Sequence, residues 1–312
     1  MALPQRDHGG GIDAAAARYG GTRADWIDLS TGINPAPYPV SGIPADAWTA
    51  LPDSAAAQAL TDAARSFWQV PDGAAILAAP GASSLIARIP ALRPAATVDI
   101  PAPTYNEHAA AFAAAGWQVS DDAPAARVIV HPNNPTGHWY AGEPDGFDLH
   151  VIDESFCDVA PDRSLIAHAT RPGTLVLKSF GKFWGLAGLR LGFAIGDPEL
   201  IDRLAQMLGP WPVSGPALAI GTRALTDDAW AIATRTRLNE DAARMDALMT
   251  RAGARLSGGT PLFRLYDVDN AAKWQDRLAK AQIWTRTFPY SDTLIRLGLP
   301  APDQWHRMEA AL

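Results

Sequence analysis

The sequence of 312 residues contains a single cysteine, Cys157, which limits the chemistry open to the chain. No intrachain disulfide can form, and a cysteine-based metal site is not expected. Cys157 follows Phe156 in an apolar stretch, which favours a small buried core residue over a reactive thiol. No stretch approaches the roughly 18 apolar residues of a membrane span. We therefore expect neither a disulfide-bonded nor a membrane-spanning protein.

An excess of positive charge is also lacking, because 33 acidic residues outnumber 26 basic ones and the formal net charge is −7. Such a composition offers no basic surface for nucleic acid or for anionic membranes. Any anionic ligand must be bound by a local cluster of donors. Residues 1–11 show neither the apolar core of a secretory signal nor the Arg-rich pattern of a transit peptide. The sequence therefore predicts a cytoplasmic protein that binds a small molecule, with no metal.

The sequence does contain an alternation of short apolar runs with helical patterns. The runs typical of buried parallel strands are 75–79, 96–100, 127–131, 149–152 and 174–177. Helical patterns cover 14–19, 54–68, 84–92 and 104–115, with Ser54 as the expected N-cap of the second. The alternation predicts an α/β fold with a mostly parallel sheet and crossover helices. A long helical pattern at 227–251, followed by strand candidates at 262–266, 283–287 and 294–297, predicts a second, smaller α+β domain.

The segment that runs from Lys178 to Phe193 carries the most informative chemical pattern. It follows a predicted strand and is rich in glycine, serine and cationic residues. A lysine held in a partly dry pocket beside other cations has a lowered pKa, so its free amine can attack an aldehyde. Lys182 is the candidate, while Ser179 and Arg190 offer a hydroxyl and a guanidinium suited to a phosphate dianion. A glycine-rich surface loop with two unrelated cations is the alternative interpretation.

Two carboxylates and a pair of asparagines form weaker motifs. Asp153 and Glu154 end a predicted strand, where α/β proteins place ligands, and an aspartate there can hold a pyridine nitrogen protonated. On its own, an Asp-Glu pair at a strand end is more often a helix cap or a surface turn. Asn133 and Asn134 precede Pro-Thr-Gly in a rigid turn that projects an amide side chain.

Two further segments follow predicted strands. Gly81, Ala82 and Ser83 lead from a strand into a helix, and the backbone N–H groups of such a turn bind phosphate in many α/β folds. Tyr105 comes directly after another strand, where its ring could stack on a planar cofactor or simply cap the sheet. Neither segment is specific when taken alone.

Taken together and in this order, the motifs resemble those of the fold-type I pyridoxal-5′-phosphate (PLP) enzymes. The chain is similar to class I/II aminotransferases, above all to the histidinol-phosphate aminotransferase branch, over nearly its whole length. The resemblance implies a three-layer α/β/α large domain with a mostly parallel sheet at 36–212. It also implies a small α+β domain made from residues 1–35 and 213–312, and a homodimer.

The same resemblance implies PLP as the cofactor and gives roles to individual residues. Lys182 would bind the cofactor as a Schiff base and shuttle protons, Asp153 would pair with the pyridine nitrogen, and Tyr105 would stack on the ring. Asn134 would donate to the phenolic oxygen of the ring. The residues that would surround the cofactor phosphate are Gly81, Ala82, Ser83, Ser179 and Arg190.

Two positions depart from the family pattern. Phe156 stands where many relatives carry a tyrosine whose hydroxyl helps bind the phenolic oxygen, so Asn134 would act there without it. Gly181 replaces a serine that is often found just before the lysine, which removes one phosphate donor. Both changes suggest a divergent branch.

The N-terminal residues narrow the choice of reaction. The His8-Gly9-Gly10-Gly11 opening and the later Ser30-Thr-Gly-Ile-Asn34-Pro motif resemble the threonine-phosphate decarboxylases of cobalamin biosynthesis. This resemblance implies conversion of O-phospho-L-threonine to (R)-1-amino-2-propanol phosphate. A decarboxylase must turn the substrate carboxylate out of the plane of the cofactor ring, and anchoring the far end of the substrate would set that rotation.

A phosphorylated amino-acid substrate needs a second anionic site. The candidate substrate-binding residues are His8, Gly9, Asn34, Asn134, Arg286 and Arg296. Arg286 and Arg296 match positions of substrate-binding arginines in relatives, and the sequence does not assign the phosphate to either one. Arg296 lies in an apolar run and needs a partner for its charge. Transamination and a non-catalytic scaffold role are the alternative functions.

Overall fold

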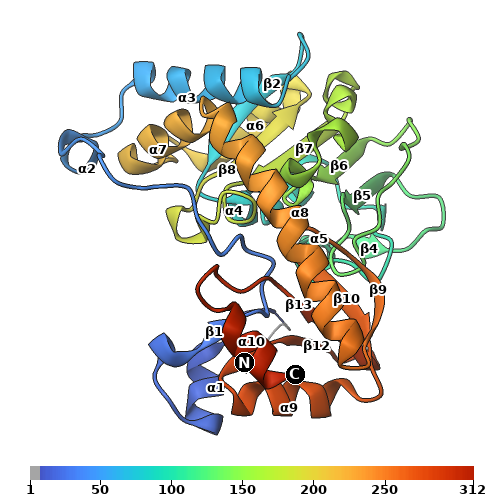
Figure 1. Ribbon diagram of the computed structural model, residues 1–312. Helices are drawn as coiled ribbons and strands as arrows, with labels where there is room; N and C mark the ends of the chain where they lie inside the picture. The colour runs from blue at the N-terminus through green and yellow to red at the C-terminus, as the bar shows by residue number, and fades with distance from the viewer. Residues whose placement is uncertain (1–7) are drawn as a thin grey trace. The chain divides into compact units, whose positions relative to one another are not determined.

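The computed structural model describes residues 8–312, and the chain divides into two compact units (Figure 1). Unit 1 contains the described residues up to Ala36, together with Pro135–His138 and Thr234–Leu312. Unit 2 contains Pro37–Asn134 and Trp139–Ala233. Among the described residues, no helix combines the length and the apolar character needed to cross a membrane.

Unit 2 is built on a seven-stranded sheet in the order β2-β8-β7-β6-β5-β3-β4. Its strands are β2 (Ala75–Ala79), β3 (Thr97–Asp99), β4 (Gln118–Val119), β5 (Ala126–Val130), β6 (Leu149–Asp153), β7 (Thr174–Ser179) and β8 (Gly192–Gly196). β8 runs antiparallel to both of its neighbours, and the other neighbouring pairs are parallel. The mostly parallel sheet confirms the predicted fold class.

Helices cover both faces of this sheet. They are α3 (Ser54–Phe67), α4 (Ala82–Ile86), α5 (Asn106–Ala114), α6 (Pro198–Leu208) and α7 (Gly215–Leu225), and the short α2 (Asp46–Thr49) contacts α7. Alternate strand residues such as Val128 and Leu175 pack in one core with α4, α5 and α6. Their neighbours point to the opposite face, where Phe193 of β8 lies 4.9 Å from the ring of Trp68, which directly follows α3. The three layers follow from this alternation.

Two helix boundaries differ from those predicted from the sequence. The N-cap of α3 is Asp53, because its carboxylate accepts a hydrogen bond from the Ala56 amide, so Ser54 is the first helical residue and not the cap. The helix predicted at 84–92 ends at Ile86 and is followed by a separate 3₁₀ helix at Ile89–Leu92, which contains Pro90.

Unit 1 combines both ends of the chain. Its elements are α1 (Ile12–Tyr19), β1 (Ile27–Asp28), β9 (Arg255–Thr260), β10 (Phe263–Asp267), α9 (Ala271–Lys280), β11 (Ile283–Trp284), β12 (Arg286–Phe288), β13 (Ser291–Leu297) and α10 (Trp305–Ala311). The strands form an antiparallel sheet in the order β12-β13-β10-β9 and a parallel pair, β1-β11. Ile12 and Ala15 of α1 pack against Ala279 of α9, which joins the N-terminal segment to the C-terminal one.

The division into units differs from the predicted domains in three places, the smallest of which is Ala36, a residue of unit 1. Residues 213–233 belong to unit 2, and the boundary lies within α8 (Asp228–Arg251). The reason is that α7 packs on α3, where Gly221 leaves room for the side chains of Leu60 and Leu191. Pro135–His138 belongs to unit 1, because Thr136 accepts a hydrogen bond from the Gly259 amide.

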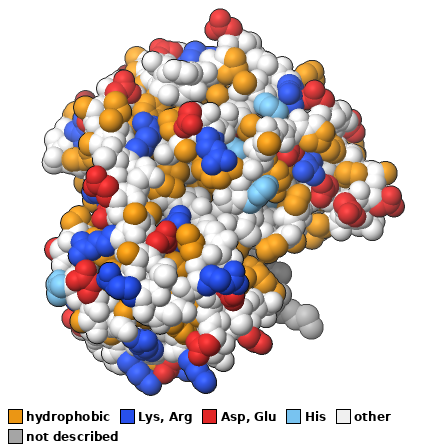
Figure 2. All heavy atoms as spheres, turned by 45° about the vertical axis from the view of Figure 1, so that its right-hand side comes forward, with side chains coloured by type: hydrophobic (Ala, Val, Ile, Leu, Met, Phe, Trp, Pro, Cys, Tyr) orange, Lys and Arg blue, Asp and Glu red, His pale blue; other side chains and the backbone are white. Residues whose placement is uncertain are grey.

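Short 3₁₀ helices complete the structure at Arg23–Asp25, Cys157–Val159, Pro161–Arg163, Ile166–Thr170 and Ala187–Leu189. On the face drawn in Figure 2, cationic and anionic side chains are interspersed. Cys157 is fully buried, in agreement with its prediction as a core residue.

Candidate active site

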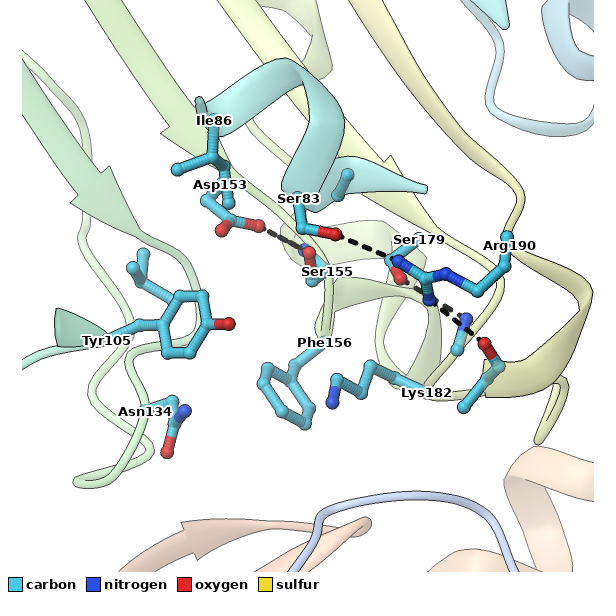
Figure 3. A pocket seen from close by; sticks show the side chains of 14 residues that line it. Ser83, Ile86, Tyr105, Asn134, Asp153, Ser155, Phe156, Ser179, Lys182 and Arg190 are labelled. Atoms are coloured by element: carbon cyan, nitrogen blue, oxygen red, sulfur yellow. Dashed lines mark hydrogen bonds between the residues drawn. The ribbon is translucent and has the colours of Figure 1, made fainter. Parts of the chain in front are cut away.

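A cavity of about 230 Å³ opens in unit 2 where three neighbouring strands end. Val130 of β5, Asp153 of β6 and Ser179 of β7 are the last residues of their strands, and all three line it. Ligands of α/β proteins bind at this carboxyl edge of the sheet. The predicted residues that line the cavity are Ala82, Ser83, Tyr105, Asn134, Asp153, Ser179, Lys182 and Arg190 (Figure 3).

One end of the cavity gathers hydroxyl groups around a guanidinium. Arg190 donates from Nη2 to Ser83 Oγ at 2.8 Å and from Nη1 to the Ala187 carbonyl at 3.0 Å. Arg190 has a φ of 53°, a left-handed conformation that is uncommon outside glycine. Gly81 leaves space for it, because a Cβ there would lie 2.5 Å from Arg190 Nη2. With Ser179 nearby in the lining, this end suits a phosphate dianion.

Asp153 provides a buried carboxylate elsewhere in the cavity lining. Its Oδ2 lies 2.8 Å from His108 Nε2, and its Oδ1 accepts hydrogen bonds from the amide and hydroxyl of Ser155. Burial by itself raises the pKa of Asp153, but the hydrogen bonds from His108 and Ser155 outweigh this effect and hold the pKa below its usual value. The carboxylate therefore stays ionised and can stabilise a cation such as a protonated ring nitrogen.

His108 was not predicted as a site residue. It lies in the first turn of α5 and is almost fully buried, and its ring is 6.0 Å from that of Tyr105 in an edge-to-face arrangement. The usable signal in the sequence is the spacing, because residues three apart on a helix share a face. His108 thus connects α5 to the carboxylate at the end of β6, and the Tyr105 ring packs against the imidazole.

Lys182 is half-buried and projects into the cavity from the loop after β7 (Figure 3). Its Nζ lies 5.3 Å from the centre of the Phe156 ring, within the range of a cation–π contact. The loop is anchored just beyond the lysine, where Trp184 is fully buried and donates from Nε1 to Asp158 Oδ2 at 3.2 Å. This anchor holds the lysine at the cavity.

The two acidic residues predicted together at the end of β6 point in opposite directions. Asp153 lines the cavity, whereas Glu154 accepts hydrogen bonds from Ser164 Oγ and the Leu165 amide and lies 2.6 Å from Lys178 Nζ in the interior. Burial alone lowers the pKa of Lys178, but Glu154 and nearby acidic groups raise it above its usual range. Glu154 is thus a structural partner of a buried cation.

His131, Glu154 and Cys157 are close enough to suggest a metal site. The hydrogen bonds around them argue against that use. His131 accepts from the Tyr140 amide at Nδ1 and donates from Nε2 to the Arg163 carbonyl, so neither ring nitrogen offers a lone pair to an ion. The oxygens of Glu154 are likewise occupied by Lys178 and its hydrogen-bond donors.

Unit 1 holds the predicted substrate arginines as direct neighbours. Arg286 of β12 lies opposite Arg296 of β13 in the antiparallel register. Arg296 is 5% exposed and donates from Nη2 to the Ser30 carbonyl at 2.6 Å. Burial lowers the pKa of Arg296 to about 10, and the like charge of Arg286 adds to the effect. Two adjacent guanidiniums form a cationic cluster whose chemistry suits an anion.

The N-terminal glycines lie beside the same cluster. The Gly10 amide donates to Ser30 Oγ at 2.6 Å, and a Cβ on Gly9 would lie 2.4 Å from the Ser30 carbonyl oxygen. Only glycine permits this approach. Ser30 thus joins the N-terminal segment to Arg296, a connection that the sequence did not predict.

Asn34 and His8 have different surroundings. Asn34 is buried, and its Oδ1 accepts hydrogen bonds from the Ala36 amide and from Arg237 Nη2 at 2.6 Å. Arg237 was not predicted. His8 is exposed at the start of the described residues.

Comparison with known proteins places this chain in a family. A family model described as aminotransferase class I and II matches residues 149–310. Together with full-length relatives more than 30% identical, this match shows that the chain belongs to the class I and II aminotransferase family. The predicted family and fold class are therefore confirmed.

Within that family, the chain is similar to proteins named threonine-phosphate decarboxylase. It is 42% identical to one from a Sinorhizobium species, over 95% of this chain and 93% of the relative. It is 39% identical to one from Pseudomonas aeruginosa, over 98% of this chain and 97% of the relative.

Solved structures share the fold. The histidinol-phosphate aminotransferase of Sinorhizobium meliloti in complex with pyridoxal-5′-phosphate superposes with a TM-score of 0.83 at 19% identity, covering 100% of this chain and 94% of that one. The L-threonine-O-3-phosphate decarboxylase of Porphyromonas gingivalis gives a TM-score of 0.76 at 18% identity, covering 91% and 97%.

Proposed function

We propose that the protein is a PLP-dependent enzyme that decarboxylates O-phospho-L-threonine to (R)-1-amino-2-propanol phosphate for cobalamin biosynthesis. The observation that carries the proposal is the similarity, along nearly the whole chain, to relatives named threonine-phosphate decarboxylase. The cavity supports it, because a lysine, a buried carboxylate and a hydroxyl–guanidinium cluster line one space. These are the groups that PLP requires.

When bound, PLP supplies an electron sink for the electron pair that the departing carboxylate leaves on the substrate α-carbon. Lys182 would hold the cofactor through its Nζ amine and would supply the proton that replaces CO₂ on the α-carbon of the substrate. Asp153 stabilises positive charge at the ring nitrogen, since its carboxylate stays ionised. Ser83, Ser179 and Arg190 bind the phosphate group.

The remaining site residues orient the two molecules. Tyr105 would pack on the cofactor ring, and Asn134 would donate its amide to the phenolic oxygen of the cofactor. Phe156 has no hydroxyl and instead offers its ring to Lys182. Since both Tyr105 and Asn134 line the cavity, the geometry is consistent with these roles.

Arg286 and Arg296 bind the two anionic groups of the substrate, with one guanidinium on the phosphate and the other on the carboxylate. Their adjacency on β12 and β13 supports this proposal. Gly9 completes the anion site through the contact of the N-terminal segment with Ser30, and His8, the residue before it, is the remaining N-terminal candidate. Asn34 acts through Arg237, because its Oδ1 accepts from that guanidinium.

The proposal includes a homodimer in the cytoplasm. Support for the dimer comes from unit 2, where Trp48, Leu51 and Trp211 are each more than half exposed. Leu51 and Trp211 line two apolar hollows that share Pro52 and Leu218, so the exposed groups belong to one surface. Apolar patches of this kind mark interfaces. Sedimentation analysis should show a dimer, and Leu51→Glu should shift it toward monomer.

The test of the proposed reaction is to incubate PLP-loaded protein with O-phospho-L-threonine and to follow CO₂ and the amine product by mass spectrometry. We expect one CO₂ for each aminopropanol phosphate. A keto acid with pyridoxamine phosphate and no CO₂ would make the protein an aminotransferase. A protein that shows no cofactor absorbance after addition of PLP would favour the scaffold role.

A further inference from the structure

Two neighbouring turns carry the cavity residues Tyr105 and Asn134. One turn follows β3 and leads to Tyr105, and the other follows β5 and contains Asn134. β3 and β5 are adjacent parallel strands, paired at Val98 with Ala126, so both turns lie at the same edge of the sheet. Figure 3 shows the Tyr105 ring and the Asn134 amide on one side of the cavity, across from Lys182.

Asn133 links these two turns directly. Its side chain is 5% exposed, and it uses both halves of its amide on the turn that leads to Tyr105. Asn133 Oδ1 accepts from Thr104 Oγ1 at 2.6 Å, and Nδ2 donates to the Pro103 carbonyl at 3.0 Å. Each end of this bridge is one residue away from a side chain of the cavity.

The turn that contains Asn134 is also held at its start, by hydrogen bonds of His131. His131 accepts from the Tyr140 amide at 3.2 Å and donates to the Arg163 carbonyl at 2.8 Å. With its start held in this way, the turn is tied to its neighbour by Asn133 at the point where Asn134 enters the cavity. An amide is required for the bridge, because aspartate lacks the donor and an aliphatic side chain lacks both groups.

We propose that Asn133 is a positioning residue that sets the placement of Tyr105 relative to Asn134, and thereby the orientation in which the cavity holds the cofactor ring. The inference rests on the proposed function, because it assumes that PLP binds in this cavity. Ring orientation matters for the reaction, since only the α-carbon bond perpendicular to the ring breaks. Asn133 therefore also affects the ratio of decarboxylation to transamination.

The first probe alters the bridge at Thr104 and leaves both asparagines in place. Thr104→Val removes the hydroxyl with little change in shape, and Thr104→Ser keeps it as the matched control. Asn133→Asp is the second probe, because it keeps the acceptor for Thr104 and replaces the donor to Pro103 by a carboxylate oxygen. For each variant we would measure PLP affinity, the visible circular dichroism per bound cofactor, and the ratio of CO₂ to keto product at saturating PLP.

We expect Thr104→Val and Asn133→Asp to weaken PLP binding about tenfold, as the loss of one buried hydrogen bond implies. Both should change the circular dichroism per bound cofactor and raise the share of keto product, whereas Thr104→Ser should match the parent protein. Lower thermal stability with unchanged dichroism and product ratio would overturn the inference and indicate a purely structural bridge. A parent protein that binds no PLP would instead overturn the proposed function, and this inference with it.

Discussion

Lys178 and Lys182 stand close together in the sequence, yet the structure gives them opposite surroundings. Lys178 is on β7 with its side chain 2% exposed, and its Nζ lies 2.6 Å from Glu154 and 3.6 Å from Asp158. Lys182 is half-buried in the loop beyond β7, lines the cavity and faces the ring of Phe156. Lys178 forms ion pairs with carboxylates inside the protein, and Lys182 is accessible to a ligand in the cavity.

The contrast teaches which buried charge is structural and which is available for chemistry. The carboxylates keep Lys178 an ammonium, and an ammonium has no lone pair with which to attack a carbonyl. Asp153, the last residue of β6, and Glu154, which follows the strand, repeat the pattern, because Asp153 lines the cavity and Glu154 pairs with Lys178 in the interior. In the interior, the charge of Lys178 is neutralised by Glu154 and Asp158. In the cavity, Lys182 and Asp153 are available to the cofactor.

Substitution of Lys182 should have the largest effect on activity. Lys182→Ala removes the amine that holds the cofactor and moves the proton, so decarboxylation should fall by at least about 10³-fold. Thermal stability should change little, because the lysine is half-buried at the cavity. Rates of CO₂ release and calorimetry of the same samples would check both parts. Substantial turnover by this variant would contradict the assigned role.

Arg296 extends the comparison between Lys178 and Lys182 to a cation of unit 1. Arg296 is buried beside a like charge, and its pKa is lowered, whereas the pKa of Lys178 is raised. Arg296→Gln should therefore reduce kcat/KM for O-phospho-L-threonine by about 10²-fold, as the loss of a buried charge contact implies. Unchanged kcat/KM would remove the arginine from the substrate site. Arg255→Gln, at an exposed ion pair with Asp267 in the same unit, is the control.

The carboxylate of Asp153 can be probed through pH. The hydrogen bonds from His108 and Ser155 keep its pKa low, so its contribution is present at neutral pH and is lost as pH falls through that lowered value. His108→Phe should raise the pKa of Asp153 and move the acid limb of the kcat profile upward by about one pH unit. A limb that stays in place would exclude His108 as the group that maintains the charge.

Substitution of Lys178 should have the smallest effect on catalysis and a clear effect on stability. Lys178→Met leaves Glu154 buried without its cation, which costs about 3–5 kcal/mol and lowers Tm by about 5–10 °C. Because the pKa of Lys178 is raised, its contribution is complete below the ordinary lysine pKa and constant between pH 6 and 9. Thermal scans across that range would check it. A loss of activity as large as that of Lys182→Ala would erase the contrast between the two lysines.

The sequence predicts the structure best where a local pattern of residue types is enough to identify an element. Buried parallel strands are continuous apolar runs, and all five predicted runs became strands of the large sheet. β8 was not predicted, since Gly192–Gly196 has only three apolar residues between glycines that allow close backbone approach. The cavity residues were predicted from the order of the motifs along the chain, which can be read without knowledge of the fold.

Contacts between distant segments could not be predicted. His108 meets Asp153, and Asn133 meets Thr104, only after β3, β5 and β6 have assembled. The opposite directions of Asp153 and Glu154 depend on where β6 ends, which the pattern placed one residue early. Ser30 belongs to the N-terminal motif, but its contact with Arg296 joins residues from opposite ends of the chain.

The most direct test of the contrast between the two lysines is to reduce the PLP-loaded protein with borohydride and to map the modified peptide by mass spectrometry. Reduction turns the bond between a lysine and the cofactor into a stable amine, so the label marks the residue that held the aldehyde. The structure predicts one pyridoxyl group, on Lys182, and an unmodified Lys178. A label on Lys178, or on neither lysine after full loading, would contradict the account.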